Sequence, residues 1–560
     1  MIEFLLEIPL NKKITNLAEF FIRKPVIELQ FQDANYEFIA WGDPIYDSDF
    51  KERLQKDPTT EFIINNLFGH YYYILKNKIT SEIILGNSMF SILPLYYSQH
   101  NDKIVFSENS ANLGKHLNLN TISQRFIIET VLFNYPLFNN SIFKEIKLLL
   151  SNSYLKILGS QITITKHTFI EKYFLNSPEP TKNSIHMVRD IFLETVKKYL
   201  PDVKYAHALT GGFDGRTLVS AGLYHKKYFS CYAFGSESSK DTRIASQLSF
   251  KAGVTFINVE LNDEYASESS LGCGTEFILN SSGTGTFARA HYLYAAKVLS
   301  NDYKYIITGN FGSELFRAAH IAGAVISKNL YALFNSGNPA EGIKSIENSV
   351  EFRCLNLSED KASWETLKDD ILKLPCYDQS YNGLTKNQRF YVLVFEEIFR
   401  KYFGAEMVNQ FKYLKNRTPF LDMEFMKALF KTELAGIHSN FFEHNPFKRY
   451  KGQILYAHII RKAYPAFGEM MTDKGYKPDD LINFFGKLNI ARGYLKKITR
   501  KPTPDFDPYA VKKSWETNWD YWINIPISEE FFDLKKVKAG INKEILFKIL
   551  SLSYLVKGIR

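Results

Sequence analysis

Short apolar runs of strand length alternate with longer runs of helix length in the middle of the chain. The strand-length runs cover residues 205–209, 228–234, 254–261 and 303–308. The helix-length runs cover residues 216–225, 242–252 and 287–299. This alternation predicts βαβ units and a parallel sheet. Ligands of such sheets bind beyond the carboxyl ends of the strands, so the loops at that edge are the first place to look for a site.

The loop after the first strand-length run is rich in glycine. It reads Leu209-Thr210-Gly211-Gly212-Phe213-Asp214-Gly215. The glycines allow a ligand to approach the backbone closely, and the N-terminus of the following helix favours phosphate. Asp214 would offer an oxygen to the Mg²⁺ that accompanies such a phosphate. The loop lacks the Lys of the Gly-x-x-x-x-Gly-Lys-Ser/Thr motif, and it does not match Gly-x-Gly-x-x-Gly.

This loop resembles the Ser-Gly-Gly-x-Asp-Ser loop of the ATP pyrophosphatase superfamily. Thr210 keeps the hydroxyl of the first Ser, whereas Gly215 lacks that of the last. Three later segments resemble, in the same order, motifs of asparagine synthetases. They are 307–316, similar to the Ser-Gly-Glu-Gly-Ser-Asp-Glu-Val-Phe loop, 418–422, similar to Val-Pro-Phe-Leu-Asp, and 456–476, similar to the last helix and the Lys-x-Gly-Phe segment.

The N-terminal third resembles class II glutamine amidotransferase domains. The matching stretches are 67–72, Gly86, 93–97 and 105–108. That family uses a Cys at position two as nucleophile, where this chain has Ile2, and its first cysteine is Cys231. The Gly-Arg-Asp that binds glutamine reads Gly86-Asn87-Ser88 here. We therefore expect no glutaminase activity, which is the pattern of lasso-peptide cyclases and β-lactam synthetases.

The resemblance covers roughly residues 60 to 480 and implies an α/β protein of two domains. Residues 1–176 would form a degenerate, Ntn-hydrolase-like β-sandwich. Residues 182–560 would form a parallel-sheet ATP pyrophosphatase domain, of the adenine nucleotide alpha hydrolase-like type, with helical additions. A polar, proline-bearing linker at 177–181 separates the two. The last eighty residues carry no motif that resembles a known one.

The resemblance also implies ATP and Mg²⁺ as cofactors and a set of site residues. The residues that would bind ATP are Leu209, Thr210, Gly211, Gly212, Asp214, Gly215, Ala233, Thr308 and Gly309. Mg²⁺ would lie on Asp214 and Ser313, with Asp241 as either a further ligand or a helix cap. Lys474 would neutralise charge on the leaving pyrophosphate or in the second step.

Two positions depart from the family pattern. Asn310 stands where the family has a Glu that helps the amine attack, and Ser313 stands where it has a second Mg²⁺-binding Asp. Glu314, which the family also has, is the nearest carboxylate that could take part. The predicted catalytic set is therefore Lys474, Glu314 and Asn310, with a magnesium site that relies on phosphate oxygens and water.

Composition and charge are compatible with a cytoplasmic enzyme. The chain of 560 residues has a formal net charge of +9, with a denser basic run at 492–501. No nucleic-acid-binding module accompanies that run, so we expect no nucleic-acid partner. There is no signal-peptide pattern and no apolar run of membrane-spanning length. The four cysteines show no CxxC spacing, and we expect them to be reduced.

Three functions stay open. The first is an AMP-forming amide ligase that binds its amine directly and joins it to a carboxylate of a small molecule or peptide, for example in macrolactam closure within a biosynthetic cluster. The second is an asparagine synthetase that uses ammonia, or related activity on another acid, and the changes at Asn310 and Ser313 argue against it. The third is an inactive ATP-binding scaffold, against which Asp214 and Lys474 argue.

Overall fold

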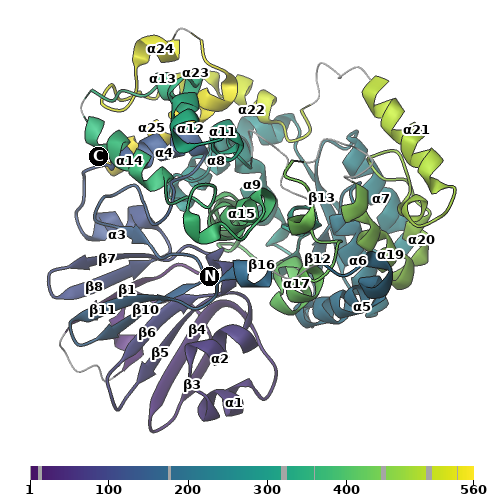
Figure 1. The fold of residues 1–560 in the computed structure, drawn as a ribbon, viewed down its shortest axis with the longest axis horizontal. Coiled ribbons are helices and arrows are strands. Elements are labelled where there is room, and N and C mark those ends of the chain that lie inside the picture. Colours follow the sequence, from purple (N-terminus) through teal and green to yellow (C-terminus); the bar gives the residue numbers. More distant parts are fainter. Residues whose placement is uncertain are drawn as a thin grey trace.

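The protein is an α/β structure with two antiparallel sheets, one parallel five-stranded sheet and many helices (Figure 1). It is represented by a computed structural model. The residues that it describes are 2–10, 16–174, 178–316, 325–358, 360–442, 450–499, 507–538 and 540–560.

The two antiparallel sheets are built from the N-terminal part of the chain. One has the order β2-β1-β8-β7-β9, with β1 Leu5–Pro9, β2 Phe21–Arg23, β7 Tyr96–His100, β8 Lys103–Ser107 and β9 Lys147–Leu148. The other has the order β11-β10-β6-β5-β4-β3, with β3 Ile27–Gln32, β4 Tyr36–Ile45, β5 Phe68–Asn77, β6 Ile83–Asn87, β10 Ser153–Leu158 and β11 Gln161–Lys166. The helices here are α1 Phe50–Lys56, α2 Thr60–Asn66, α3 Ser110–His116 and α4 Gln124–Phe133.

Strands β4 and β5 are apolar on both faces because both faces are covered. Trp41 and Tyr72 lie in the core that also contains Phe4, the residue before β1, and the Trp41 and Tyr72 rings are stacked 5.5 Å apart. The alternate residues Phe38 and Tyr73 face a second core with α1 and α2. Successive residues of these strands face opposite cores, so both sets of alternate positions are apolar and the strands are hydrophobic along nearly their whole length.

A buried carboxyl in this region gives a testable pH dependence. Glu108 accepts a hydrogen bond from the Phe4 N–H at 2.9 Å, and burial raises its pKa to about 7. A raised folded-state pKa stabilises the fold at low pH, and that contribution is lost as the pH rises through 7. Between pH 5 and pH 8 the ionisation of Glu108 should lower the free energy of unfolding by about 2–3 kcal/mol, and we expect Glu108→Gln to abolish this decrease. Denaturant unfolding at the two pH values measures it. Exposed Glu61→Gln is the control; equal pH dependence in wild type and Glu108→Gln would contradict the assignment.

The parallel sheet confirms the alternation seen in the sequence. Its order is β14-β13-β12-β15-β16, with β12 Tyr205–Ala208, β13 Ser230–Gly235, β14 Phe256–Glu260, β15 Tyr305–Ile307 and β16 Lys415–Arg417. The strands are joined by α6 Asp214–Tyr224, α7 Lys240–Ala252, α8 Ser270–Asn280 and α9 Ala290–Leu299. Helix α5, Thr181–Tyr199, begins at the last residue of the expected linker 177–181, of which Ser177 lies outside the described residues.

The edge strand β16 was not predicted, because its sequence is polar. Its pairing with β15 is parallel, and its basic side chains reach the N-terminal sheets. Lys415 lies 2.8 Å from Glu28, and Arg417 lies 2.7 Å from Asp43. Glu28 lies in β3 and Asp43 in β4, so these ion pairs connect the edge of the parallel sheet to the six-stranded antiparallel sheet.

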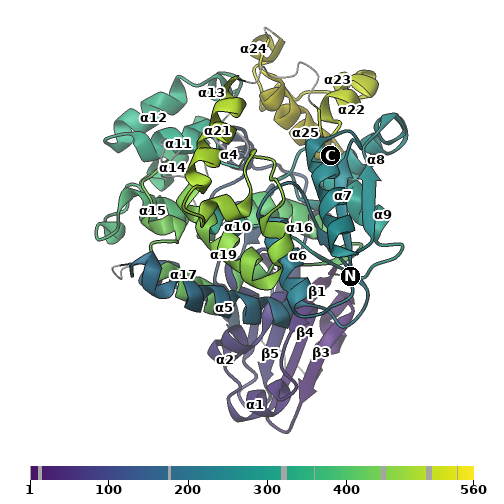
Figure 2. The same cartoon turned by 90° about the vertical axis from the view of Figure 1, so that its right-hand side faces the viewer.

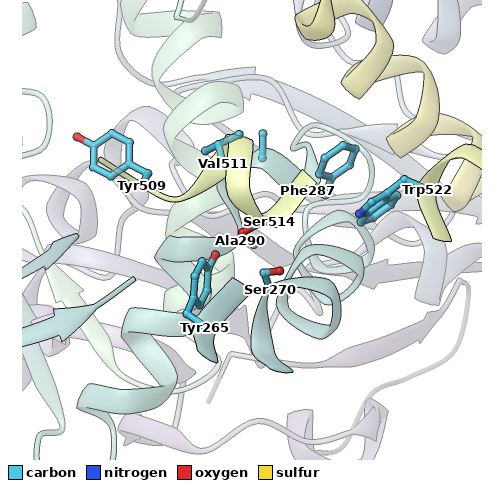
Figure 3. Close-up of a pocket in the computed structure, with 9 residues that line it drawn as sticks. Tyr265, Ser270, Phe287, Ala290, Tyr509, Val511, Ser514 and Trp522 are labelled. Carbon is cyan, nitrogen blue, oxygen red and sulfur yellow. The ribbon is translucent and has the colours of Figure 1, made fainter. Parts of the chain in front are cut away.

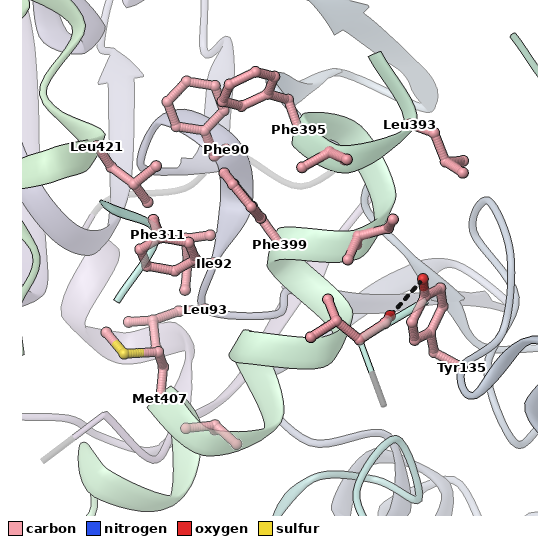
Figure 4. Close-up of a cluster of buried hydrophobic side chains, with 14 of the residues drawn as sticks. Phe90, Ile92, Leu93, Tyr135, Phe311, Leu393, Phe395, Phe399, Met407 and Leu421 are labelled. Atoms are coloured by element: carbon pink, nitrogen blue, oxygen red, sulfur yellow. Dashed lines mark hydrogen bonds between the residues drawn. The ribbon is translucent and has the colours of Figure 1, made fainter. Parts of the chain in front are cut away.

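The N-terminal sheets also share an apolar core with the helical part. Figure 4 shows Phe90, Ile92 and Leu93 packed against Phe311 and Phe399, which belong to the later half of the chain. Further helices follow the fourth strand. They are α10 Gly312–Phe316, α11 Lys328–Asn335, α12 Pro339–Glu347, α13 Val350–Arg353, α14 Lys361–Ile371, α15 Lys386–Leu393, α16 Gly404–Gln410, α17 Met423–Phe430, α19 Ile454–Ala463, α20 Pro465–Gly468 and α21 Gly486–Thr499, with a π-helical segment at Val394–Phe403.

The C-terminal segment folds back onto the helices around the parallel sheet (Figure 2). Its helices are α22 Val511–Thr517, α23 Trp519–Ile523, α24 Leu534–Lys538 and α25 Lys543–Ile559. Helix α25 contacts α4 and α8, and the Phe287 ring is stacked 4.0 Å from Trp522. The segment without a recognisable motif is thus part of the main core. All four cysteines are free, and no helix among the described residues could span a membrane.

Candidate active site

The glycine-rich loop lies where β12 leads into α6, at the carboxyl edge of the parallel sheet. Leu209 still pairs with the neighbouring strand, donating to the Tyr232 carbonyl at 2.8 Å. A Cβ on Gly215 would lie 2.5 Å from the Ala208 carbonyl oxygen, so only glycine fits at this crossing. The tight strand-to-helix turn of this chain therefore requires glycine at 215, and a serine with its hydroxyl could not take this place.

Asp214 is the first residue of α6, and its carboxylate accepts hydrogen bonds from two hydroxyl groups. Ser313 Oγ donates to Asp214 Oδ2 at 2.8 Å, and Tyr456 OH donates to Oδ1. The loop carrying Ser313 is pressed against Asp214, because a Cβ on Gly309 would lie 2.7 Å from the Asp214 Cβ. The two positions proposed for the metal thus lie side by side. Tyr456, from α19, had no role predicted from the sequence.

Asp241 faces the loop and is not the cap of its helix. The N-cap of α7 is Ser239, whose side chain accepts from the Thr242 N–H at 3.1 Å. Asp241 Oδ1 instead accepts from the Gly211 N–H at 3.1 Å. Burial, with the nearby charge of Asp473, raises the pKa of Asp241. A carboxylate therefore accepts from one of the loop N–H groups proposed to bind phosphate.

Lys474 lies next to the glycine-rich loop. Its ammonium group is 5.1 Å from the centroid of the Phe213 ring. The preceding residue, Asp473, donates its N–H to the Gly211 carbonyl at 3.0 Å. Gly475 has a φ of +85°, a conformation that favours glycine and lets the chain turn sharply after Lys474. The sequence-predicted cation and phosphate loop are thus brought together.

Arg216 holds the segment that leads to Lys474. Its side chain is fully buried at 0% exposure and donates to the carbonyls of Phe467, Met470 and Met471 at 3.1, 2.7 and 2.9 Å. We expect Arg216→Met to cost about 3 kcal/mol of unfolding free energy, because buried carbonyls lose their donors. Denaturant unfolding measures it, with exposed Arg243→Met as control. An unchanged stability would show that these bonds are not needed to hold the segment.

The other predicted nucleotide residues lie along the same edge. Leu209, Ala233 and Thr308 are buried, and Thr308 Oγ1 donates to Asn416 Oδ1 at 2.9 Å. The C-terminal segment crosses the end of β13, since a Cβ on Gly235 would lie 2.9 Å from the Pro508 carbonyl oxygen. No motif in the sequence indicated this approach.

The predicted catalytic residues beyond Lys474 have different surroundings. Asn310 Nδ2 donates to Glu406 Oε1 at 3.0 Å, so a carboxylate that the sequence did not single out lies beside it. Glu314 is the third residue of α10, and its carbonyl oxygen accepts from Tyr391 OH at 2.6 Å. The carboxylate that accepts a hydrogen bond from Asn310 is thus Glu406, which is distant in the sequence, and the expected neighbour Glu314 does not take this place.

The residues present fit a magnesium ion held mainly by a nucleotide. Among the described residues, no group of three or more His, Cys, Asp and Glu is arranged to hold a metal. Asp214 and Ser313 supply one carboxylate and one hydroxyl oxygen at 2.8 Å from each other. Mg²⁺ usually takes one or two carboxylates and fills its remaining positions with phosphate oxygens and water.

A small pocket lies between residues 265–290 and the C-terminal segment (Figure 3). It is lined by Tyr265, Ser270, Phe287, Ala288, Ala290, Tyr509, Val511, Ser514 and Trp522. None of these residues belongs to the 209–215 loop. Tyr509 stacks on His291 with ring centroids 4.8 Å apart.

Comparisons with known proteins give little further information. No family model and no curated protein matches the chain. Among solved structures, one that it matches is the glutamine phosphoribosylpyrophosphate amidotransferase from B. subtilis complexed with ADP and GMP, with 8% identity over 42% of this chain and a TM-score of 0.16. The match spans 48% of that protein. A likeness this distant supports no argument about fold or function.

Proposed function

We propose that this protein is an ATP-dependent ligase that adenylates a carboxylate, releases pyrophosphate and transfers the acyl group to an amine. The proposal is carried by one observation: the Thr210–Asp214 loop, Ser313 and Lys474 meet at the carboxyl edge of one parallel sheet. The motif resemblance supports the choice of ATP. It also supports two domains, 1–176 and 182–560, of which the first has no glutaminase role.

Each residue group has a distinct task in this scheme. Loop N–H groups and the Thr210 hydroxyl bind the phosphates, and Asp214 with Ser313 holds Mg²⁺, which supplies charge neutralisation. Lys474 neutralises the negative charge that develops as pyrophosphate leaves. Asp241 must release the Gly211 N–H before a phosphate can use it, because one N–H cannot serve both anions at full strength.

The acyl and amine substrates belong to a small molecule or a peptide. Closure of a peptide macrolactam is one such reaction. Ile2 stands where a cysteine would release ammonia from glutamine, so the amine is expected to bind directly. Ammonia-dependent asparagine synthesis is less favoured, because Asn310 and Ser313 replace two carboxylates. An inactive scaffold would retain ATP without cleaving it.

The test is product analysis with ATP, Mg²⁺ and a panel of carboxylates and peptides. We expect AMP and pyrophosphate in equal amounts, together with exchange of labelled pyrophosphate into ATP. ADP and phosphate as products would refute the adenylation chemistry. ATP binding with no cleavage across the panel would favour the scaffold.

Glutamine is expected not to serve as nitrogen source. Ile2 occupies the position of the catalytic cysteine and is buried at 1% exposure, and Asn87 donates its side-chain amide to the Leu93 carbonyl at 2.7 Å. Purified protein incubated with glutamine should release no glutamate above a heat-denatured blank. Glutamate release that scales with protein concentration would contradict this expectation.

A further inference from the structure

Asn310 and Glu406 belong to a chain of hydrogen bonds that runs from the end of β15 into α16. Thr308 donates to Asn416, Asn416 Nδ2 donates to Gln410 Oε1 at 2.7 Å, and Gln410 Nε2 donates to Glu406 Oε1 at 3.2 Å. Each donor in this series points toward Glu406. The four residues Thr308, Asn416, Gln410 and Glu406 are 5% exposed or less.

Glu406 is held as an acceptor by its surroundings. Its Oε1 accepts hydrogen bonds from the side chains of Asn310 and Gln410, and its Oε2 accepts one from Arg289 Nη2 at 3.3 Å. Burial raises the pKa of Glu406, and Arg289, Asn310 and Gln410 oppose that rise by favouring the carboxylate. The carboxyl group accepts all three hydrogen bonds, two on Oε1 and one on Oε2, and the charge of Arg289 favours its ionised form.

This arrangement fixes which way the Asn310 amide points. Its NH₂ group is used by Glu406, so its oxygen faces the other way. The next residue, Phe311, adopts a φ of +72°, and its ring is held 4.8 Å from both Phe399 and Phe403. Packing therefore holds the backbone beside Asn310 in a conformation that is costly for a residue with a side chain.

We propose that Asn310 binds the attacking amine through its amide oxygen, and that Glu406 is the positioning residue that keeps this oxygen turned toward the amine. The site favours the neutral amine, because an uncharged oxygen orients an N–H while stabilising the unreactive ammonium form less than a carboxylate would. As the C–N bond forms, the bond between the acyl carbon and the AMP phosphate oxygen breaks, and the proton lost by the amine passes to water or to the departing AMP phosphate. Gly309, the residue before Asn310, lies against Asp214, where the acyl-adenylate would form. The amine assignment rests on the proposed function, whereas the pairing of Asn310 with Glu406 does not.

The pairing is tested by stability, without substrate. Asn310→Asp places two carboxylates about 3 Å apart, which raises the pKa of the pair, so its stability should fall as pH rises through that value. We expect the Tm gap from wild type to widen by about 2–4 °C between pH 5 and pH 8. Other ionisable groups near Glu406 are Arg289, Tyr232, Tyr292 and Tyr509, and the tyrosines stay neutral over this range.

A double variant isolates the interaction. When Asn310→Asp is combined with Glu406→Gln, the repulsion is gone and the new glutamine amide can donate to the new aspartate. The Tm loss should be smaller than the sum of the two single losses, and the widening with pH should vanish. Exposed Asn301→Asp controls for added charge. Additive losses, or a gap independent of pH, would overturn the pairing.

The amine role is tested by separating the two half-reactions. In Asn310→Ala and Glu406→Gln, labelled pyrophosphate exchange should stay near wild type, while amide formation falls about tenfold or more. Equal loss in both half-reactions would overturn the amine assignment even where the stability pairing holds. Absence of exchange in wild type would instead refute the proposed function, and the stability measurements would still decide the pairing.

Discussion

Replacement of Asp214 by Asn is expected to abolish the conversion of ATP to AMP and pyrophosphate. The amide keeps the size of the side chain and can still accept one of the hydroxyl groups of Ser313 and Tyr456. It removes the only carboxylate among the two residues proposed to hold Mg²⁺. Loss of such a charge from a transition state costs about 3–4 kcal/mol or more, which is at least a 100- to 1,000-fold loss of rate.

The expected defect is in turnover and magnesium dependence, with the fold intact. Because Asp214 is half-buried and doubly hydrogen-bonded, Asp214→Ala would disturb the start of α6 as well, so Asn is the sharper substitution. Asp202→Asn on the surface is the matched control, and Ser313→Ala should show a milder loss. Wild-type AMP production by Asp214→Asn at limiting Mg²⁺ would place the metal elsewhere.

The parallel sheet and its glycine-rich loop could be predicted because both depend on local sequence. Buried parallel strands are continuous apolar runs, and the helices between them have a fixed length. The requirement for glycine at 215 comes from the backbone of Ala208, only a few residues earlier. Such features arise within one strand-loop-helix unit, so they can be predicted from residues that are close together in the sequence.

The missing parts of the site depend on contacts between distant segments. Tyr456 reaches Asp214 across 242 positions, and Glu406 reaches Asn310 across 96. Tyr456 lies in α19 and Glu406 in α16, and nothing in the sequence around either residue indicates which distant side chain it contacts. Strand β16 escaped prediction for a similar reason, since its polar residues are stabilised by ion pairs with another part of the fold.

Removal of the Lys474 charge is expected to slow turnover about 100- to 1,000-fold, as for loss of one contact to developing charge. Lys474→Met keeps most of the apolar stem and removes the ammonium group, which lies over the Phe213 ring. Ground-state ATP is also neutralised by Mg²⁺, so its affinity should change much less than the rate. The charge matters most as pyrophosphate departs, or as negative charge develops in the second step.

Measurements of ATP affinity and of single-turnover AMP formation separate these effects. Exposed Lys487→Met, on the neighbouring helix α21, is the matched control for loss of one positive charge near the site. Pyrophosphate exchange then tells which step uses the cation. A loss in exchange assigns Lys474 to adenylation, whereas a loss in amide formation alone assigns it to the transfer step. Wild-type turnover, or a defect confined to ATP affinity, would exclude Lys474 as the cation that stabilises a transition state.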